Sequence, residues 1–283
     1  SASSNLQGTA TLIGDPPSMI LAGYLKLTFN DFFVYQGRAG IFFAVQVGAL
    51  ASLAYMAFLF RRHRAPVDLV PSETIRSWVP TVLLVALVAG LAVTSLIDPG
   101  FKWLAGTFTL ALALLGLAWY RLLLKPRWGS VRTLIRTLDW DTTFFLIGVF
   151  IVVGALSESG LLEQVAQGIT RLLGTNLLVA YLFIIVLAVV VSAFVDNVPF
   201  LLAMIPVCQA IARDLNAPGP LLYFALLIGA CLGGNITPIG ASANVVTLGI
   251  LKKQGHVVRF GEFMRIGIPF TLVAVTAASL FVW

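Results

Sequence analysis

The feature that most constrains this chain is a series of long apolar runs with almost no charged residues. A helix needs about 20 apolar residues to cross a bilayer. Some of the runs reach that length, and several are too short to cross alone. They cover residues 37–60, 77–97, 103–124, 142–156, 176–195, 200–212, 220–233 and 266–283. They predict an all-α polytopic membrane protein whose main partner is the lipid bilayer.

Composition agrees with this interpretation. Of the 283 residues, 59% are hydrophobic and 11% are charged, which is too little polar surface to coat a soluble globule of this size. The net charge of +6 comes from short basic clusters between the runs, which argues against a nucleic-acid partner. The two cysteines, Cys208 and Cys231, lie in apolar stretches, so we interpret them as buried packing residues.

The distribution of Lys and Arg predicts the orientation. If the loop after Phe60 is cytoplasmic, alternation of the spans places most of the basic residues inside, as the positive-inside rule expects. The inside set is Arg61, Arg62, Arg64, Arg76, Arg121, Lys125, Arg127, Arg132, Arg136, Lys252, Lys253, Arg259 and Arg265. The outside set is Lys26, Arg38, Lys102, Arg171 and Arg213. The run 37–60 then enters the membrane from outside, and the run 266–283 enters it from inside.

One polar phrase occurs twice. TLIGDPPSMI at 11–20 and TPIGASANVV at 237–246 share their first Thr, an Ile-Gly pair and a small polar residue before two apolar ones, 226 positions apart (237 minus 11). Downstream, Phe29-x-Asp31-Phe32 matches Phe260-x-Glu262-Phe263, which we interpret as an interfacial segment with an aromatic anchor. Because the spans that follow run in opposite directions, we expect an inverted repeat.

Both copies contain residues that cannot continue a helix. Asp15-Pro16-Pro17 breaks the first copy, and Gly233-Gly234-Asn235 with Pro238 breaks the second. Irregular backbone at membrane depth is tolerated only where protein or a water-filled cavity satisfies it. Paired broken helices in an inverted repeat are typical of a secondary transporter's binding site, whose helix ends and carbonyl groups hold a cation or an anionic substrate.

The stretch VVSAFVDNVPF at 190–200 places Asp196 and Asn197 inside an apolar run, followed by Pro199. It predicts a re-entrant hairpin with this pair at its tip. A carboxylate near the bilayer centre costs about 2.5–3.5 kcal/mol on insertion scales, so its presence indicates an ion or proton site. The alternative is a structural hydrogen bond that holds the hairpin tip together.

Further candidate ligands are hydroxyl and amide side chains in the same segments. They are Asn5, Thr9, Thr11 and Ser18 in the first copy, and Ser192, Asn235, Thr237, Ser242 and Asn244 in the second half. Asp15 has two open interpretations, a helix cap or a substrate contact. The second copy has Ala241 in its place, so the repeat does not require an acid there.

Four motifs together carry a resemblance to a known family. SNLQGTATLIGDPPS, LDWDTTFFLIGVFIVVGALSESGLL, SAFVDNVPF and GGNITPIGASANVV resemble the ion transporter superfamily, most closely its branch of arsenite permeases, NhaD-type sodium/proton antiporters and P protein. Citrate-metal and divalent-anion/sodium symporters are related to that branch. The resemblance implies re-entrant hairpins, broken helices and a homodimer. It implies a hairpin tip at Ser192, Asp196 and Asn197, and unwound loops that include Gly14 and Gly240.

The resemblance also bears on domain organisation. Residues 1–60 match the end of a first repeat, residues 61–138 connect the repeats, and residues 139–283 form a second repeat. The family's first repeat has its own hairpin ahead of the first unwound loop. This chain begins at that loop, so we expect either a truncated chain or part of a split protein, or a chain whose missing half is supplied by another polypeptide.

We therefore expect an ion-coupled permease that moves a small anion or oxyanion by alternating access across a prokaryotic plasma (inner) membrane. Na+ or H+ is the expected coupling ion, with Na+ held by Asp196 and Asn197, and no other cofactor is expected. A sodium/proton antiporter that carries a monovalent cation and an incomplete fragment are the alternatives. We do not expect an enzyme, since His63 and His256 lie in loops away from any buried serine, and no nucleotide motif is present.

Overall fold

The structure is a computed structural model that describes residues 2–61, 77–98, 103–123, 132–133, 136, 140–253 and 255–283. Several residues on which the sequence predictions of orientation and of enzyme class depend lie outside these ranges. They are Arg62, His63, Arg64, Arg76, Lys102, Lys125 and Arg127.

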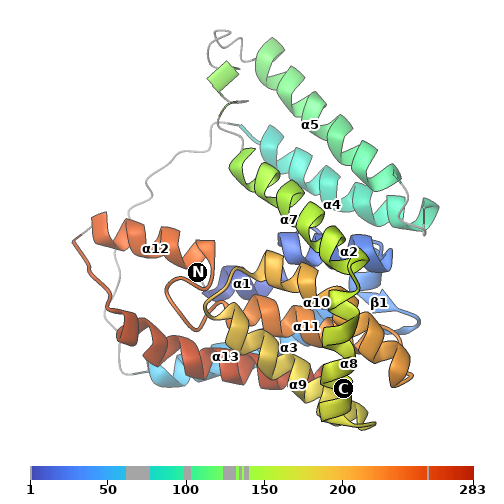
Figure 1. The fold of residues 1–283 in the computed structure, drawn as a ribbon. Coiled ribbons are helices and arrows are strands. Elements are labelled where there is room, and N and C mark those ends of the chain that lie inside the picture. Colours follow the sequence, from blue (N-terminus) through green and yellow to red (C-terminus); the bar gives the residue numbers. More distant parts are fainter. Residues whose placement is uncertain are drawn as a thin grey trace.

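The described residues form helices and one short β-hairpin (Figure 1). The N-terminal part contains α1 (Ala2–Gly8), α2 (Pro16–Leu25), the 3-10 helix η1 (Asn30–Phe32), β1 (Val34–Tyr35), β2 (Arg38–Ala39) and α3 (Ile41–Leu59). The middle contains α4 (Val79–Ile97) and α5 (Leu104–Leu123). The C-terminal part contains α7 (Trp140–Glu158), α8 (Leu161–Leu173), α9 (Leu177–Ser192), α10 (Asn197–Asp214), α11 (Leu221–Gly233), α12 (Ser242–Lys253) and α13 (Phe260–Val282).

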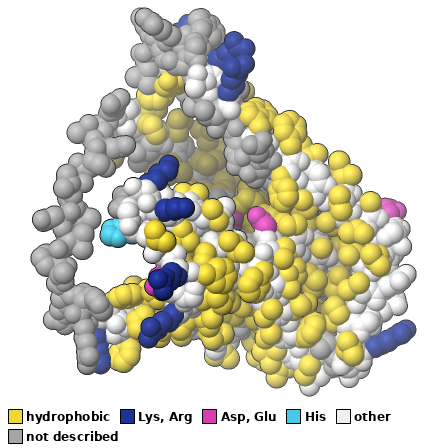
Figure 2. Space-filling model, turned by 60° about the vertical axis from the view of Figure 1, so that its left-hand side comes forward, with side chains coloured by type: hydrophobic (Ala, Val, Ile, Leu, Met, Phe, Trp, Pro, Cys, Tyr) yellow, Lys and Arg dark blue, Asp and Glu magenta, His cyan; other side chains and the backbone are white. Residues whose placement is uncertain are grey.

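Four of the described helices, α3, α4, α5 and α13, are long and apolar enough to cross a membrane. The segments Thr143–Leu156 and Leu161–Leu172 form a fifth candidate that is bent by 69°. Hydrophobic side chains cover much of the right-hand part of the surface in Figure 2, and several Lys and Arg side chains lie at the left near a histidine. The predicted fold class is confirmed, because the chain is an all-α polytopic membrane protein.

Helix α8 was not predicted from the sequence. Its segment is only 13 residues long and carries Glu163 and Arg171, so it does not stand out as an apolar run. It folds as a helix because Leu162 and Ala166 share one buried face while the charged residues are exposed. Gly160, at a φ of 71°, makes the sharp entry into the helix.

Helix α11 lies at the centre of the fold, and nearly all of its side chains are buried. Its glycines allow the closest contact with α9. A methyl group on Gly229 would come within 2.6 Å of Ala188 Cβ, and one on Gly233 within 2.6 Å of the Val189 carbonyl oxygen. Small residues four apart let membrane helices approach in this way. The α9–α11 pair therefore provides the rigid support for the segment that follows α11.

Helices α3 and α13 form the other extensive helix pair. Their backbones approach closely at Gly48. A methyl group on Gly48 would lie 2.8 Å from the carbonyl oxygen of Ala274. The contact thus packs α3 closely against α13 and joins the N-terminal and C-terminal parts of the chain.

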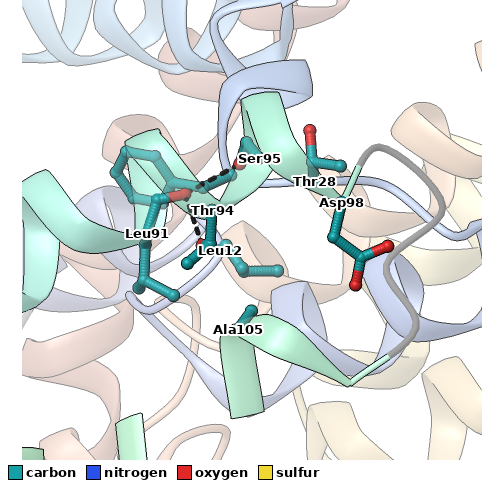
Figure 3. Close-up of a pocket in the computed structure, with 8 residues that line it drawn as sticks. Leu12, Thr28, Leu91, Thr94, Ser95, Asp98 and Ala105 are labelled. Carbon is teal, nitrogen blue, oxygen red and sulfur yellow. Dashed lines mark hydrogen bonds between the residues drawn. The ribbon is translucent and has the colours of Figure 1, made fainter. Parts of the chain in front are cut away.

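Helices α4 and α5 pair with each other and extend away from the remaining helices (Figure 1). Asn30 ties them to the body, since its backbone N–H bonds Ser95 Oγ at 3.3 Å and its side chain bonds the Ala92 carbonyl at 3.0 Å. A void of about 10 Å³ lies beside this junction (Figure 3). The hydroxyl groups of Thr94 and Ser95 around it bond back to Leu91. We interpret it as a packing void.

The two Phe-x-acid-Phe segments share a local role for their acid. The backbone N–H of Thr28 donates to Asp31 at 2.6 Å, and that of Arg259 donates to Glu262 at 2.9 Å, so each acid caps the chain three residues before it. The expected interfacial aromatic anchor is wrong for the first copy. Phe29 and Phe32 are 5% and 1% exposed, because they pack into the protein core.

Candidate functional site

Each repeated phrase folds as a helix, a loop and a second helix. Loop 1 (residues 9–15) joins α1 to α2, and loop 2 (residues 234–241) joins α11 to α12. Their backbone hydrogen bonds recur with the same offset of 226 residues. Ala10 N donates to Gln7 O at 3.1 Å, and Ile236 N donates to Gly233 O at 3.0 Å. Gly14 N donates to Thr11 O at 3.2 Å, and Gly240 N donates to Thr237 O at 3.3 Å. Ser18 N donates to Asp15 O at 3.1 Å, and Asn244 N donates to Ala241 O at 3.0 Å.

Equivalent side chains also close the two loops. Ser18 Oγ donates to the carbonyl of Gly8 at 3.3 Å, and Asn244 Nδ2 donates to the carbonyl of Gly234 at 2.8 Å. Both bonds span ten residues. Closure also needs small residues. A methyl group on Gly14 would clash with the Gly8 carbonyl, and one on Gly240 would lie 2.7 Å from the Gly234 carbonyl oxygen. The two loops therefore have one geometry.

Three buried amide side chains connect the loops to each other. Asn244 Nδ2 donates to the carbonyls of Gly234 and Thr237, at 2.8 and 2.9 Å, which fixes its Oδ1 as an acceptor. Asn5 Nδ2 then donates to Oδ1 of Asn244 at 3.4 Å and to Oδ1 of Asn235 at 2.9 Å. The orientation of each amide thus follows from the backbone carbonyls at the start of the network.

One buried donor in this network, Nδ2 of Asn235, is unsatisfied within the described part of the chain. Asn235 is 1% exposed, and its Nδ2 has no hydrogen-bond partner among the described residues. A buried donor without a partner costs about 1–3 kcal/mol, so native proteins rarely leave one. The Nδ2 atom of Asn235 is a donor suited to a bound anion or carbonyl group.

The tip of the α9–α10 hairpin packs against loop 2. The hydroxyl of Thr237 bonds the carbonyl of Ala193. The hydroxyl of Ser192 contacts the carbonyl of Ala230 and lies 3.2 Å from Asn197 Oδ1. Ser192, Asn197 and Thr237 are buried here. Their contacts match the structural interpretation of the tip that the sequence left open.

Asp196 occupies the N-cap of α10, where its Oδ1 accepts from Val198 N at 2.9 Å. Its side chain is exposed, unlike that of Asn197. Capping requires one carboxylate oxygen and leaves the second for other ligands. The ion-binding role of Asp196 and Asn197 stays a prediction.

Asp15 occupies the equivalent cap position of α2 but makes no side-chain cap bond. Pro16 and Pro17 follow it, and neither has the backbone N–H that a cap would bind. Its half-buried carboxylate faces the thiol of Cys231 instead and interacts electrostatically with Asp196. The Asp15 carboxylate thus interacts with α11 through Cys231 and lies within electrostatic range of Asp196 at the tip of the α9–α10 hairpin.

Cys231 is a site residue that sequence reasoning missed. Thr9 and Asp15 both interact with its thiol, which is fully buried. Cys231 lies 226 positions after Asn5, so its contact with Thr9 in loop 1 corresponds to the contact of Asn5 with Asn235 in loop 2. The offset between the copies is the signal that could have found it.

The remaining predicted residues differ between the loops in how they are covered. Thr237 and Gly240 are buried beneath the hairpin tip, whereas Thr11 is half-buried and Gly14 is exposed. Ser242 is exposed at the start of α12. Thr9 is buried, and its hydroxyl bonds the carbonyl of Asn5 at 3.2 Å. All the predicted residues therefore belong to the two loops, their flanking helices or the hairpin tip.

Apolar spans together with two matching loops joined by buried amides define a polytopic integral membrane protein with two broken-helix segments. Residues 1–229 match the citrate transporter family CitMHS, and the chain belongs to that family. It is 31% identical over 290 residues to a 46 kDa membrane protein of Mycobacterium leprae. It is 32% identical over 296 residues to a protein of Mycobacterium tuberculosis named an uncharacterized transporter. These alignments cover 99% of this chain and 65% of each relative.

The human P protein matches a shorter part of the chain. It is 34% identical over 177 residues, which cover 60% of this chain and 21% of the P protein. These relatives and the family confirm the resemblance to the ion transporter superfamily.

Proposed function

We propose that this chain forms the substrate and ion site of an ion-coupled secondary transporter that moves a small anion by alternating access. The observation that carries the proposal is the buried Nδ2 of Asn235, a donor that the protein itself leaves without a partner. The family's description names citrate, so we take citrate as the first substrate to test.

The anion is assigned to loop 2. Asn235 supplies the spare donor, and Ser242 supplies an exposed hydroxyl at the N-terminal end of α12. The positive end of a helix dipole favours an anion. No acidic residue lies between 232 and 253, so nothing on this segment repels a carboxylate.

The coupling cation is assigned to the side of loop 1. At the positions equivalent to Ala241, Ser242 and Ala243, loop 1 and α2 have Asp15, Pro16 and Pro17. A carboxylate followed by two residues without N–H groups offers acceptors and few donors, which suits Na+ or H+. Asp196 adds a second carboxylate to the same region. One backbone geometry thus serves two opposite charges because a few side chains differ.

Loop 1 is more exposed than loop 2, which suggests that a further segment of the transporter packs over it. A methyl group on Gly240 would lie 2.9 Å from the Ala193 carbonyl of the hairpin tip, whereas no equivalent residue among those described covers Gly14. We propose that a second helical hairpin, from another part of the transporter, covers Thr11 and Gly14. A homodimer of the complete transporter remains part of this proposal.

Uptake of labelled citrate into proteoliposomes tests the assignment, under imposed Na+ or H+ gradients. We would use the chain alone and the chain fused behind the N-terminal third of the M. tuberculosis relative. Ser242→Ala should raise the KM for citrate by up to about tenfold, since one hydrogen bond is worth about 0.5–1.5 kcal/mol net. Asp15→Asn should alter the ion dependence. Ser159→Ala and Asp214→Asn, at exposed positions, are the matched controls.

The result separates the candidates. Citrate uptake by the fusion protein alone supports the partner hairpin. If Ser242→Ala leaves the KM for citrate unchanged and Asp15→Asn leaves the ion dependence unchanged, the assigned site is wrong. Sodium/proton exchange without anion uptake supports the antiporter alternative, which the electrostatic interaction of Asp15 with Asp196 favours.

A further inference from the structure

A second candidate binding site lies at the other end of α11 from loop 2. It is a cavity of about 760 Å³, a volume within the usual range of small-molecule pockets. The β1–β2 hairpin, the first turns of α9 and α11, and the end of α13 form its wall. Because α11 has 13 residues that rise 1.5 Å each, the cavity is about 20 Å from loop 2.

Arg38 is the one charged side chain among the described residues that line this cavity. It is exposed, and no ion pair joins it to a side-chain carboxylate in the described part of the chain. A guanidinium with its hydrogen-bond donors unpaired matches the geometry of a carboxylate or a phosphate. Arg38 therefore sets the charge of the ligand.

Aromatic rings form much of the remaining wall. Tyr35 packs edge-on against Phe224, with ring centroids 6.4 Å apart. The ring of Trp283 packs against that of Tyr181, with centroids 5.2 Å apart. Tyr181 donates its hydroxyl to the Ser279 carbonyl at 2.7 Å, which holds the end of α13 in place. These faces provide an apolar surface beside the cation, so the ligand should carry an apolar or aromatic body.

Two further features show that the wall is preformed. The hairpin turns through Gln36 and Gly37, at φ values of 49° and 78°, as a tight two-residue β-turn requires. It packs against Gly219, where a methyl group would lie 3.6 Å from the Tyr35 ring. The N-terminus of α11 and the C-terminus of α13 both lie at the cavity, so their opposite dipole ends offset each other and the positive charge comes from Arg38.

We propose that this cavity binds a carboxylate or phosphate group attached to an apolar body, with Arg38 as its cationic partner. Two sources share this chemistry, a soluble organic anion and an anionic phospholipid. The proposal does not rest on the transport function proposed above. The predicted orientation places the cavity at the outer face of the membrane, where both sources are present.

The test is equilibrium binding to the chain in phosphatidylcholine nanodiscs. Benzoate represents soluble organic anions, and phosphatidylglycerol represents anionic lipids. Trp283 fluorescence and the retention of radiolabelled probe report binding independently. We expect saturable binding of at least one probe. Arg38→Gln should weaken it by about tenfold or more, and Arg38→Lys should restore part of it, because a hydrogen bond to a charged group is lost and then partly replaced.

Lys26→Gln removes an exposed cation that does not line the cavity, so it should leave binding unchanged. Trp283→Phe should abolish the fluorescence change while labelled probe still binds. Saturation by benzoate identifies a soluble anion, and saturation by phosphatidylglycerol alone identifies a lipid. Absence of saturable binding by either probe, or equal affinity in wild type and Arg38→Gln, overturns the proposal.

Discussion

The side-chain amide of Asn5 donates to Oδ1 of Asn235 at 2.9 Å across 230 positions of sequence. The bond joins α1 of the first broken segment to loop 2 of the second, and both residues are buried. It has two consequences. The loops are held in a fixed relation to each other, and the remaining donor of Asn235 is turned away from the protein's own acceptors.

The spare donor of Asn235 makes a prediction about anion affinity. Asn235→Asp keeps an oxygen for Asn5 but replaces the NH₂ group with a second acceptor that carries negative charge. We expect the KM for anion uptake to rise about tenfold or more, because an attractive contact becomes a repulsive one.

The matched control is Asn216→Asp, at an exposed position on the loop after α10. It introduces the same charge and should leave uptake unchanged. Equal KM values in the Asn235 variant and wild type would show that this amide does not contact the anion.

Loop closure makes a prediction about stability. Gly14→Ala and Gly240→Ala each place a methyl group against a glycine carbonyl that cannot move without opening the loop. Overpacking of this kind costs about 1–3 kcal/mol, so Tm in detergent should fall by a few degrees for each variant.

Gly249→Ala is the control in α12, because no atom lies within 4 Å of the added methyl group. It should leave Tm unchanged or raise it slightly, as Ala is the better helix former. A similar Tm for all three variants would mean that the two loops tolerate a Cβ and are not closed as described.

Asp196 has a cap role that can be separated from its charge. Asp196→Asn keeps an oxygen for Val198 N and removes the charge, whereas Asp196→Ala removes both. We expect only the alanine variant to lose stability, by about 1 kcal/mol as measured by unfolding in detergent. Both variants should lose dependence on the coupling ion if the charge binds it. Ion dependence retained by Asp196→Asn would restrict the residue to its structural role.

The positive-inside pattern predicts which surface each end of the molecule faces. Gln36→Cys, in the β1–β2 hairpin, should react with a membrane-impermeant maleimide from outside intact cells. His256→Cys, beside the exposed residues Lys252, Lys253 and Arg259, should react only after the membrane is opened. Cys208 and Cys231 are fully buried and should contribute little background. Labelling of both positions from the same side would contradict the inverted arrangement.

Much of this protein could be predicted from local sequence patterns. Apolar runs identified the spanning helices because a bilayer imposes a length and an apolar composition on each of them. Prolines and glycines identified both loops because they cannot continue a helix. Helix α8 was missed because it is neither a long apolar run nor a segment broken by proline and glycine; it is amphipathic and carries two charged residues.

The contacts between distant residues depended on the tertiary structure. No local pattern encodes the bond from Asn5 to Asn235 or the interaction of Cys231 with Asp15, because each joins segments far apart in sequence. The burial of Phe32 likewise depends on distant helices that pack over it. Asp15 shows the limit most clearly. Its sequence context allowed a helix cap or a ligand contact, and the fold turned its carboxylate away from the cap position toward Cys231. The sequence by itself determined where the helices break, because backbone chemistry is local. Only packing decided which polar groups meet at the breaks and which of them is left free to bind.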